Sequence, residues 1–249
     1  MMQLNTFTLE TDKACEFKVL WSTGLKRYGS LLVRFTVDEL YKDAVIAAEL
    51  IAIRHLLFNV QVFSRTPTSA AGININVSKG AIKKFATGHS DKAHLKKFAS
   101  FIMSNGRLAN CKIEVVPAIN QYLELAVPTE PEVLEVNQST YRISEVVTTP
   151  VLGQVVLTHH AVERYIQKLR GNDSPKLPWV SLINRISNPE LIQYKLSDKV
   201  LEHKRRKYGV DNQVEIWGHP QSSFRYVVVR DAANSIPVIA TVFRREQGT

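Results

Sequence analysis

Alternation of hydrophobic and polar residues predicts several short strands in the first half of the chain. FKVLWS (17–22) and YGSLLVRFTV (28–37) are rich in β-branched and aromatic residues, and Gly24 lies in the turn between them. Three shorter runs have the same character: VQVFS (60–64), GININVS (72–78) and CKIEVVP (111–117). Each is too short for a helix and is bounded by turn-forming residues, so we expect five strands from this pattern.

Helical spacing separates these strand-like runs. In DELYKDAVIAAELIAIRHLLFN (38–59), apolar residues at positions 45, 46, 50, 53, 56 and 57 follow the three-four spacing of one buried helix face. KGAIKKFA (79–86) and DKAHLKKFASFIMSNG (91–106) have the same periodicity with basic outer faces. Strands that lead into a long helix and then alternate with helices predict a mixed α/β domain.

The second half has helical patterns first and strand patterns afterwards. VVLTHHAVERYIQKL (155–169) predicts a strand that ends at Thr158, a favourable N-cap, and then a helix. PWVSLINRISNPELIQYKL (178–196) and SDKVLEHKRRKYG (197–209) are helical in pattern. QVEIWGH (213–219), FRYVVVRD (224–231) and PVIATVFRRE (237–246) predict three closing strands. This order predicts an α+β domain with an antiparallel meander.

Charge divides the 249 residues into three parts. Residues 1–128 carry a net charge of +6, residues 129–153 of −3 and residues 154–249 of +6. The acidic stretch contains Pro131 and Pro150 and follows Pro128. We therefore predict two domains, 1–128 and 154–249, joined by a linker at 129–153 with room for one strand.

Composition narrows the range of possible binding partners and cellular compartments. A net charge of +9 and a pI of about 9.5 favour a polyanionic partner, nucleic acid before acidic membrane. No apolar run of about 18 residues exists, and MMQLNTFTLETDK lacks the basic and apolar parts of a secretory signal. Cys15 and Cys111 match no zinc spacing, which predicts buried thiols in a reducing compartment. These features predict a cytoplasmic protein.

Glu49 raises the first chemical question, because it is an acid in the apolar run AAELIAIRHLL. A solvated glutamate on an amphipathic helix is one interpretation. The other is a resemblance of residues 1–128 to the ribonuclease H-like fold, whose members carry an Asp on the first strand and a Glu on the first long helix. Further carboxylates in that family complete a site for two divalent metals. AELIAIRHLL is similar to its catalytic helix, and Asp12 precedes Glu49 by 37 residues, a spacing like the family's.

The third carboxylate of that family has no counterpart here. Ser78 and Lys79 stand where it would be expected, and a lysine opposes a cation. Asp91 or Glu124 could take its place, but no pattern in the sequence supports either. We therefore predict a relic at Asp12 and Glu49, with no metal and no other cofactor.

Residues 154–249 resemble the RelE/BrnT-like superfamily of small ribonucleases. THHAVERY, FRYVVVRD and VIATVFRR carry the resemblance. It implies RNA cleavage without metal by His, Arg, Lys or Tyr side chains. The candidates for these roles are His160, Arg164, Arg225, Tyr226 and Arg244. A His and an Arg near the start of a helix can equally cap a turn or face solvent.

Clustered cations predict contact with phosphates. Lys204, Arg205, Arg206 and Lys207 form the densest run, and Lys83–Lys84 and Lys96–Lys97 recur on the outer faces of two predicted helices. Solvated helix faces would give the same pattern, but a polyanion relieves the repulsion within such runs. Tyr165, Tyr208 and Tyr226 each follow a cation, an arrangement that suits single strands whose bases stack on rings.

Three functions follow from these patterns. The first is a non-catalytic RNA-binding protein that prefers single strands, largely independent of base sequence, and is built from degenerate nuclease-like domains. The second is a metal-independent endoribonuclease acting through the C-terminal domain. The third is a protein–protein adaptor whose basic surface serves solubility alone. The combination of the two folds is similar to the RNA-binding proteins of nucleus-forming jumbo phages, which implies a phage-encoded protein acting in the host cytoplasm.

Overall fold

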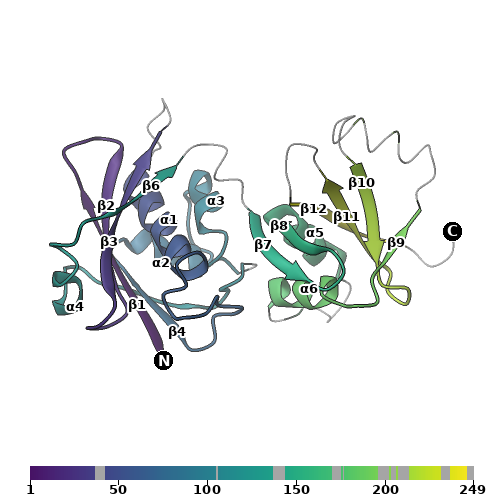
Figure 1. Ribbon diagram of the computed structural model, residues 1–249, viewed down its shortest axis with the longest axis horizontal. Coiled ribbons are helices and arrows are strands. Elements are labelled where there is room, and N and C mark those ends of the chain that lie inside the picture. The colour runs from purple at the N-terminus through teal and green to yellow at the C-terminus, as the bar shows by residue number, and fades with distance from the viewer. Residues whose placement is uncertain are drawn as a thin grey trace. The chain divides into compact units, whose positions relative to one another are not determined.

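The chain divides into two compact units, Met1–Arg142 and Ile143–Thr249, each with its own six-stranded mixed sheet (Figure 1). The computed structural model describes residues 1–36, 43–104, 106–136, 144–169, 175, 177–195, 202, 206, 213–230 and 236–245. In this part of the chain, no helix has both the length and the apolar character needed to cross a membrane.

The sheet of the first unit has the strand order β5-β4-β1-β2-β3-β6. β1, β2 and β3 are antiparallel neighbours, whereas β4 runs parallel to β1, β5 parallel to β4, and β6 parallel to β3. The strands are β1 (Met2–Glu10), β2 (Glu16–Ser22), β3 (Tyr28–Phe35), β4 (Ile73–Val77), β5 (Lys112–Val115) and β6 (Glu132–Val136). The chain thus forms a meander, crosses over through a helix and returns to the centre of the sheet beside β1.

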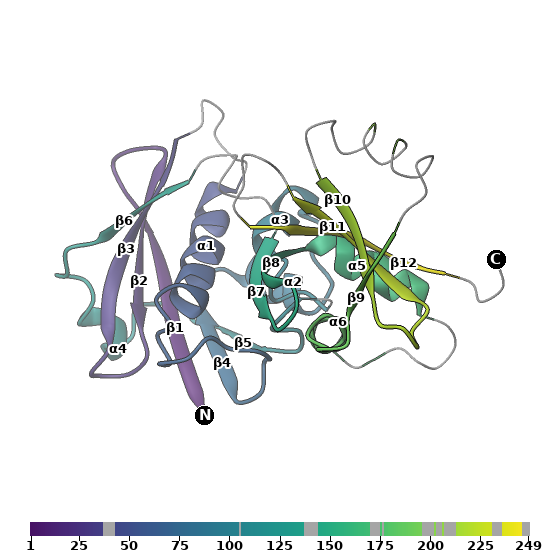
Figure 2. The same cartoon turned by 45° about the vertical axis from the view of Figure 1, so that its right-hand side comes forward.

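Helix α1 (Ala44–Phe58) provides that crossover and lies against one face of the sheet (Figure 2). It is buried along nearly its whole circumference, so it is a core helix rather than an amphipathic surface helix. α2 (Gly80–Ala86), a 3₁₀ turn (Ala93–Leu95) and α3 (Lys96–Ala99) add to the same core, and α4 (Gln121–Glu124) packs on the opposite face. Both cysteines are free thiols, and Cys111 is buried whereas Cys15 is half-buried.

The sheet of the second unit has the order β7-β8-β12-β11-β10-β9. Its strands are β7 (Ser144–Thr149), β8 (Gly153–Thr158), β9 (Ile192–Tyr194), β10 (Gln213–Gly218), β11 (Phe224–Arg230) and β12 (Val238–Arg244). All neighbours are antiparallel except β8 and β12, which are parallel. Helices α5 (His159–Lys168) and α6 (Pro178–Ile186) share a core with one face of this sheet. The closing meander agrees with the sequence, and the parallel pair makes the sheet mixed.

Residues 129–153 contribute to both sheets. β6 pairs with β3 in the first unit, and β7 forms a hairpin with β8 in the second. The boundary between the two compact units falls at 142/143, inside this stretch. The acidic character of the stretch therefore coincides with two sheet strands in its described part.

Three local predictions were wrong. Residues 60–64 are a turn rather than a strand, because Gln61 and Ser64 have left-handed φ values of 54° and 58°. The predicted helix at 91–106 is only a 3₁₀ turn and α3, after which the chain folds back so tightly that a Cβ on Gly106 would lie 2.1 Å from the Ser100 carbonyl oxygen. Residues 192–194 pair with β10 as a strand instead of continuing α6.

Candidate nucleic-acid interface

Glu49 lies at the centre of a closed polar site in the first unit. Its side chain is fully buried, which overturns the interpretation as a solvated glutamate. The Thr6 hydroxyl donates to Oε1 at 2.8 Å and the Ser78 backbone N–H to the same oxygen at 2.7 Å. The Ser78 hydroxyl donates to Oε2, also at 2.7 Å. Both carboxylate oxygens are therefore occupied by hydrogen-bond donors.

Thr6 and Ser78 reach Glu49 because β1 and β4 are parallel neighbours. Asn5 pairs with Asn76 across these strands, so Thr6 and the residues that end β4 lie side by side and face α1. A strand residue (Thr6), a helix residue (Glu49) and the residue that follows a strand (Ser78) thus converge. Two of the three are hydroxyl residues rather than carboxylates.

This donor set does not fit two divalent metal ions. Such ions need several oxygen ligands with negative charge, and here one carboxylate is surrounded by groups that point hydrogens at it. Within the described ranges, no group of three or more His, Cys, Asp or Glu side chains could hold a metal. Desolvation by burial raises the pKa of Glu49 above its ordinary value, although the bonds from Ser78 and Thr6 oppose that shift.

Asp12, the predicted partner of Glu49, lies elsewhere. β1 ends at Glu10, and Asp12 is exposed in the turn that follows. The residue of β1 that contacts Glu49 is therefore Thr6, and not Asp12 as the spacing along the chain predicted. The two possible substitutes for the missing carboxylate do not lie beside Glu49 either. Asp91 is exposed, and Glu124 lies on α4, which packs against the opposite sheet face.

The lysine pairs of the first unit lie on two helices that pack against each other. Lys83 and Lys84 are exposed in the last turn of α2, and Lys96 is exposed on α3. Lys97 is half-buried, with its ammonium 4.8 Å from the Phe98 ring centroid. Phe85 and Phe98 are buried beneath them, so the core fixes the helix faces that carry the cations.

His160 and Arg164 form an exposed pair on α5. The helix begins where predicted, because the Thr158 hydroxyl accepts the backbone N–H of Ala161 at 3.1 Å. Arg164 Nε donates to His160 Nε2 at 3.5 Å, and its Nη1 donates to the Gln167 side chain at 3.0 Å. One helical turn therefore places an imidazole beside a guanidinium at the surface.

Arg225 and Tyr226 are both buried, on opposite faces of β11. Tyr226 belongs to the core between the sheet and α5, and burial raises the pKa of its phenol, which opposes proton transfer near neutral pH. Arg225 lies over the Tyr194 ring at 4.0 Å and donates through Nη1 to the carbonyls of Ser222 and Phe224. It therefore fixes the turn before β11. Gly218 permits this arrangement, because a Cβ there would lie 2.8 Å from the Arg225 side chain.

Arg244 lines a cavity of about 450 Å³ in the second unit, which we call the arginine cavity. It is lined by Tyr165, Leu169, Ser181, Arg185, Gln221, Ser222, Ser223, Phe224 and Arg244. The guanidinium carbons of Arg185 and Arg244 lie 5.0 and 5.5 Å from the Phe224 ring centroid. Two cations thus meet over one ring, and no carboxylate is among the described lining residues.

Neutral hydroxyl groups hold both guanidinium groups in place. Arg185 Nε donates to the Tyr165 hydroxyl at 2.9 Å, which in turn lies 2.7 Å from the Ser181 hydroxyl. Arg244 Nε donates to the Ser223 hydroxyl at 2.8 Å. Neither arginine forms an ion pair with any acid in the described part of the chain, so their charges are uncompensated there.

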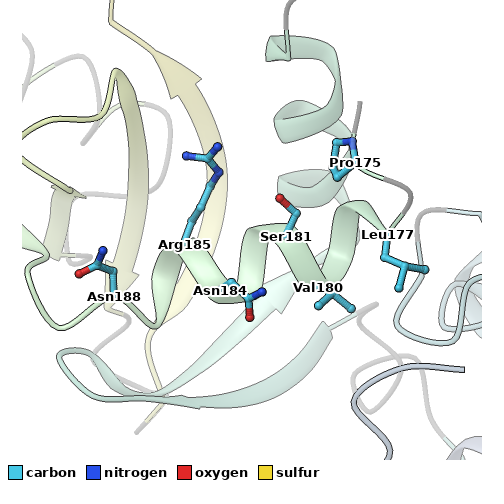
Figure 3. A pocket seen from close by; sticks show the side chains of 7 residues that line it. All are labelled: Pro175, Leu177, Val180, Ser181, Asn184, Arg185 and Asn188. Carbon is cyan, nitrogen blue, oxygen red and sulfur yellow. The ribbon is translucent and has the colours of Figure 1, made fainter. Parts of the chain in front are cut away.

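A second hollow, of about 500 Å³, wraps around α6 and shares Ser181 and Arg185 with the arginine cavity. Figure 3 shows that Ser181 and Arg185 point to one side of the helix and Val180 and Asn184 to the other. Pro175, Leu177 and Asn188 complete its lining. The hollow combines amide groups with apolar surface beside the two-arginine cluster.

Most of the predicted cationic run lies outside the described residues, namely Lys204, Arg205 and Lys207, as does the neighbouring Tyr208. Arg206 is described and exposed, and it forms an ion pair with Glu202 four residues earlier. An exposed pair of this kind contributes little to stability.

Comparison of the chain with protein-family models, with curated proteins and with solved structures found no match. The proposed function therefore rests on the geometry of the described residues. Of the residues singled out from the sequence, Arg244 and Tyr165 line the arginine cavity, but the Tyr165 side chain is fully buried and does not offer the exposed ring that base stacking needs. Arg185 was missed because an isolated arginine in LINRIS gives no pattern, and Thr6 was missed because a hydroxyl is not a metal ligand of the expected type.

Proposed function

We propose that the protein binds RNA, favouring single strands with little dependence on base sequence, and that both units are nuclease-like folds without a working catalytic centre. The arginine cavity carries this proposal. Arg185 and Arg244 converge on it without a neighbouring acid, and guanidinium groups are suited to phosphate recognition. The first unit has exposed cations of its own, the lysines of α2 and α3.

The lining of the cavity favours binding over cleavage. General acid–base chemistry needs a group that can exchange a proton near neutral pH, most often His or a carboxylate. The described lining residues include neither, and the Tyr165 side chain is fully buried and engaged with Ser181 and Arg185. The cavity therefore has the means to clamp a phosphate but lacks an acid–base pair.

The strand orders support the two fold resemblances. In the first unit, the order β5-β4-β1-β2-β3 with a buried crossover helix suits a ribonuclease H-like fold whose metal site has become the Glu49 hydrogen-bond cluster. In the second, α5 followed by the antiparallel β10-β11-β12 meander suits a RelE/BrnT-like fold. The proposal includes action on transcripts in the cytoplasm, of a host cell if the protein is encoded by a phage.

Fluorescence anisotropy with a labelled single-stranded RNA, with Mg²⁺ and with a chelator, tests the proposal. We expect saturable binding in both buffers and an RNA of unchanged length on a denaturing gel. The affinity should fall steeply with salt, because phosphate contacts release counterions. Absence of binding at moderate salt would favour the adaptor hypothesis and contradict ours.

The exposed His160–Arg164 pair favours one alternative, a metal-independent endoribonuclease. In that case RNA would shorten in the presence of the chelator, and the fragments would end in cyclic phosphates. A His160→Ala variant would then stop cleavage while retaining binding. Under our proposal, the same variant leaves the RNA intact, as the unaltered protein does.

A further inference from the structure

We propose that the arginine cavity holds the terminal phosphate of an RNA strand, a phosphomonoester, rather than a phosphate within the strand. This inference rests on the proposed RNA binding and names the part of the ligand that the cavity accepts. Its basis is the combination of two uncompensated guanidinium groups, a hydroxyl-rich wall and a limited volume.

The two arginines are fixed for ligand contact before any ligand arrives. Each uses Nε for a hydroxyl of the protein, Tyr165 for Arg185 and Ser223 for Arg244. Their terminal Nη groups make no ion pair with the described residues and remain as forked donors. Stacking over Phe224 further limits their movement. A phosphate can therefore bind without a large loss of side-chain entropy.

Charge favours a phosphomonoester. A terminal phosphate carries about −1.5 to −2 charges at neutral pH, as phosphorylated side chains do, and it has three free oxygens. A phosphodiester within the strand carries a single charge and has two free oxygens. Two guanidinium groups, together with the nearby hydroxyls of Ser181 and Ser222, match the group with more charge and more acceptors.

The size of the cavity favours a strand end. Its volume of about 450 Å³ is in the lower part of the usual range for small-ligand sites, roughly 300–1,000 Å³. Phe224 is buried in its wall, and Tyr165 is fully buried beside it. A strand that entered and left would need more room than one end group. The neighbouring hollow shares Ser181 and Arg185 with the cavity, so the next nucleotide can lie on that side of α6 (Figure 3).

Matched oligonucleotides test the inference on the full-length protein. One RNA sequence is prepared with a 5′-phosphate or a 5′-hydroxyl and a label at the 3′ end, and again with a 3′-phosphate or a 3′-hydroxyl and a label at the 5′ end. We expect one phosphorylated form to bind about tenfold more tightly than its hydroxyl counterpart, as one charge-assisted contact would give. The two arms identify which end the cavity accepts.

Variants then assign the preference to the cavity. Arg185→Gln and Arg244→Gln should each reduce the preference to less than about twofold, because each removes one of the two charges. Arg244→Lys, which keeps the charge but loses the fork, should retain part of it. Lys195→Gln is the matched control: it removes an exposed charge of the same unit outside the cavity lining and should leave the preference unchanged.

The outcomes separate the two proposals. Equal affinity of the wild-type protein for phosphorylated and hydroxyl ends would overturn this inference while leaving RNA binding intact. A preference that persists in both folded Arg→Gln variants would also overturn it. Failure to bind any of the oligonucleotides would instead contradict the proposed function. The wild-type comparison needs no variant, so it remains decisive even if a substitution impairs folding.

Discussion

Glu49 is a buried acid whose two carboxylate oxygens are both occupied by hydrogen-bond donors. Three hydrogen bonds from Thr6 and Ser78 compensate its burial in part, but burial has the larger effect and raises its pKa. A raised pKa means that the folded protein holds a proton at pH values where the unfolded chain has lost it. The contribution of this residue to stability is therefore greatest below its ordinary pKa of 4.5 and is lost as pH rises through the higher value of the folded state.

Replacement of Glu49 by Gln should remove this pH dependence. The amide oxygen can accept the bonds from Thr6 and the Ser78 N–H, and the amide nitrogen can donate to the Ser78 hydroxyl. Above pH 4.5, the free energy of unfolding of the wild type should fall relative to Glu49→Gln by at most about 1.4 kcal/mol per pH unit. Urea unfolding at a series of pH values measures the difference. Parallel curves for the two proteins would show that the carboxyl does not titrate in this way.

The same cluster predicts the response to divalent ions. Because both oxygens of Glu49 accept hydrogen bonds and its neighbours are hydroxyl residues, we expect no tight Mn²⁺ site. Calorimetric titration should give no stoichiometric binding, and Mn²⁺ should not raise the unfolding temperature. Two bound ions that disappear in Glu49→Gln would contradict the assignment of a relic.

Helices α2 and α3 together carry four lysines, and their combined effect on RNA binding can be tested in one variant. Changing Lys83, Lys84, Lys96 and Lys97 to Ala should weaken RNA binding with little effect on the fold, because Ala has the highest helix propensity. If two to four of them contact phosphates, the slope of log affinity against log salt should flatten by roughly 1.4 to 2.8 on single strands.

The cationic run at residues 204–207 provides the comparison. We predict that its quadruple Ala variant weakens RNA binding more than the lysine-pair variant. Four consecutive cations concentrate more positive charge at one place than two separate pairs do. Affinity and salt slope measured side by side decide between them. If the run variant is folded and unchanged in both quantities, α2 and α3 become the main contact of the strand backbone.

Elements with strong local signals could be predicted, and those set by distant pairing could not. β2, β3 and β4 and the three closing strands follow from alternation and turn residues, and α1 follows from its period. β9 does not, because LIQY continues an apolar pattern of helical spacing. Pro189 and the Asn188 side chain, which accepts the Glu190 N–H, end the helix, and pairing with β10 then decides the strand.

The site was less predictable than the fold for a related reason. Charge runs are visible in a sequence, whereas Arg185 and Arg244 come together only because α6 and the end of β12 each place an arginine over Phe224. Likewise, Thr6 and Glu49 are 43 residues apart and meet because β1 is central in the sheet beneath α1. Spacing along the chain does not contain this information, and it therefore indicated Asp12 instead of Thr6.

At the scale of the whole molecule, each unit has a hydrophobic core of its own. The two clusters of the first unit include α1, β1–β4 and α4, and those of the second include α5, α6 and β8–β12. We therefore expect residues 1–142 and 143–249, produced separately, to fold and to unfold cooperatively. Thermal unfolding followed by circular dichroism measures this, and a unit that is unfolded alone would show that the two depend on each other.

The separated units also test how the intact chain binds RNA. If both contact one strand, binding by the first raises the effective concentration of the second, so the intact protein should bind a long single strand more tightly than either unit, by roughly 10²-fold or more. Its salt slope should approach the sum of the two separate slopes, because each phosphate contact releases its counterions independently. On an RNA too short to reach both units, the advantage should disappear, which makes RNA length the control. Equal affinity of one unit and the intact chain on the long strand would instead place the whole interface in that unit.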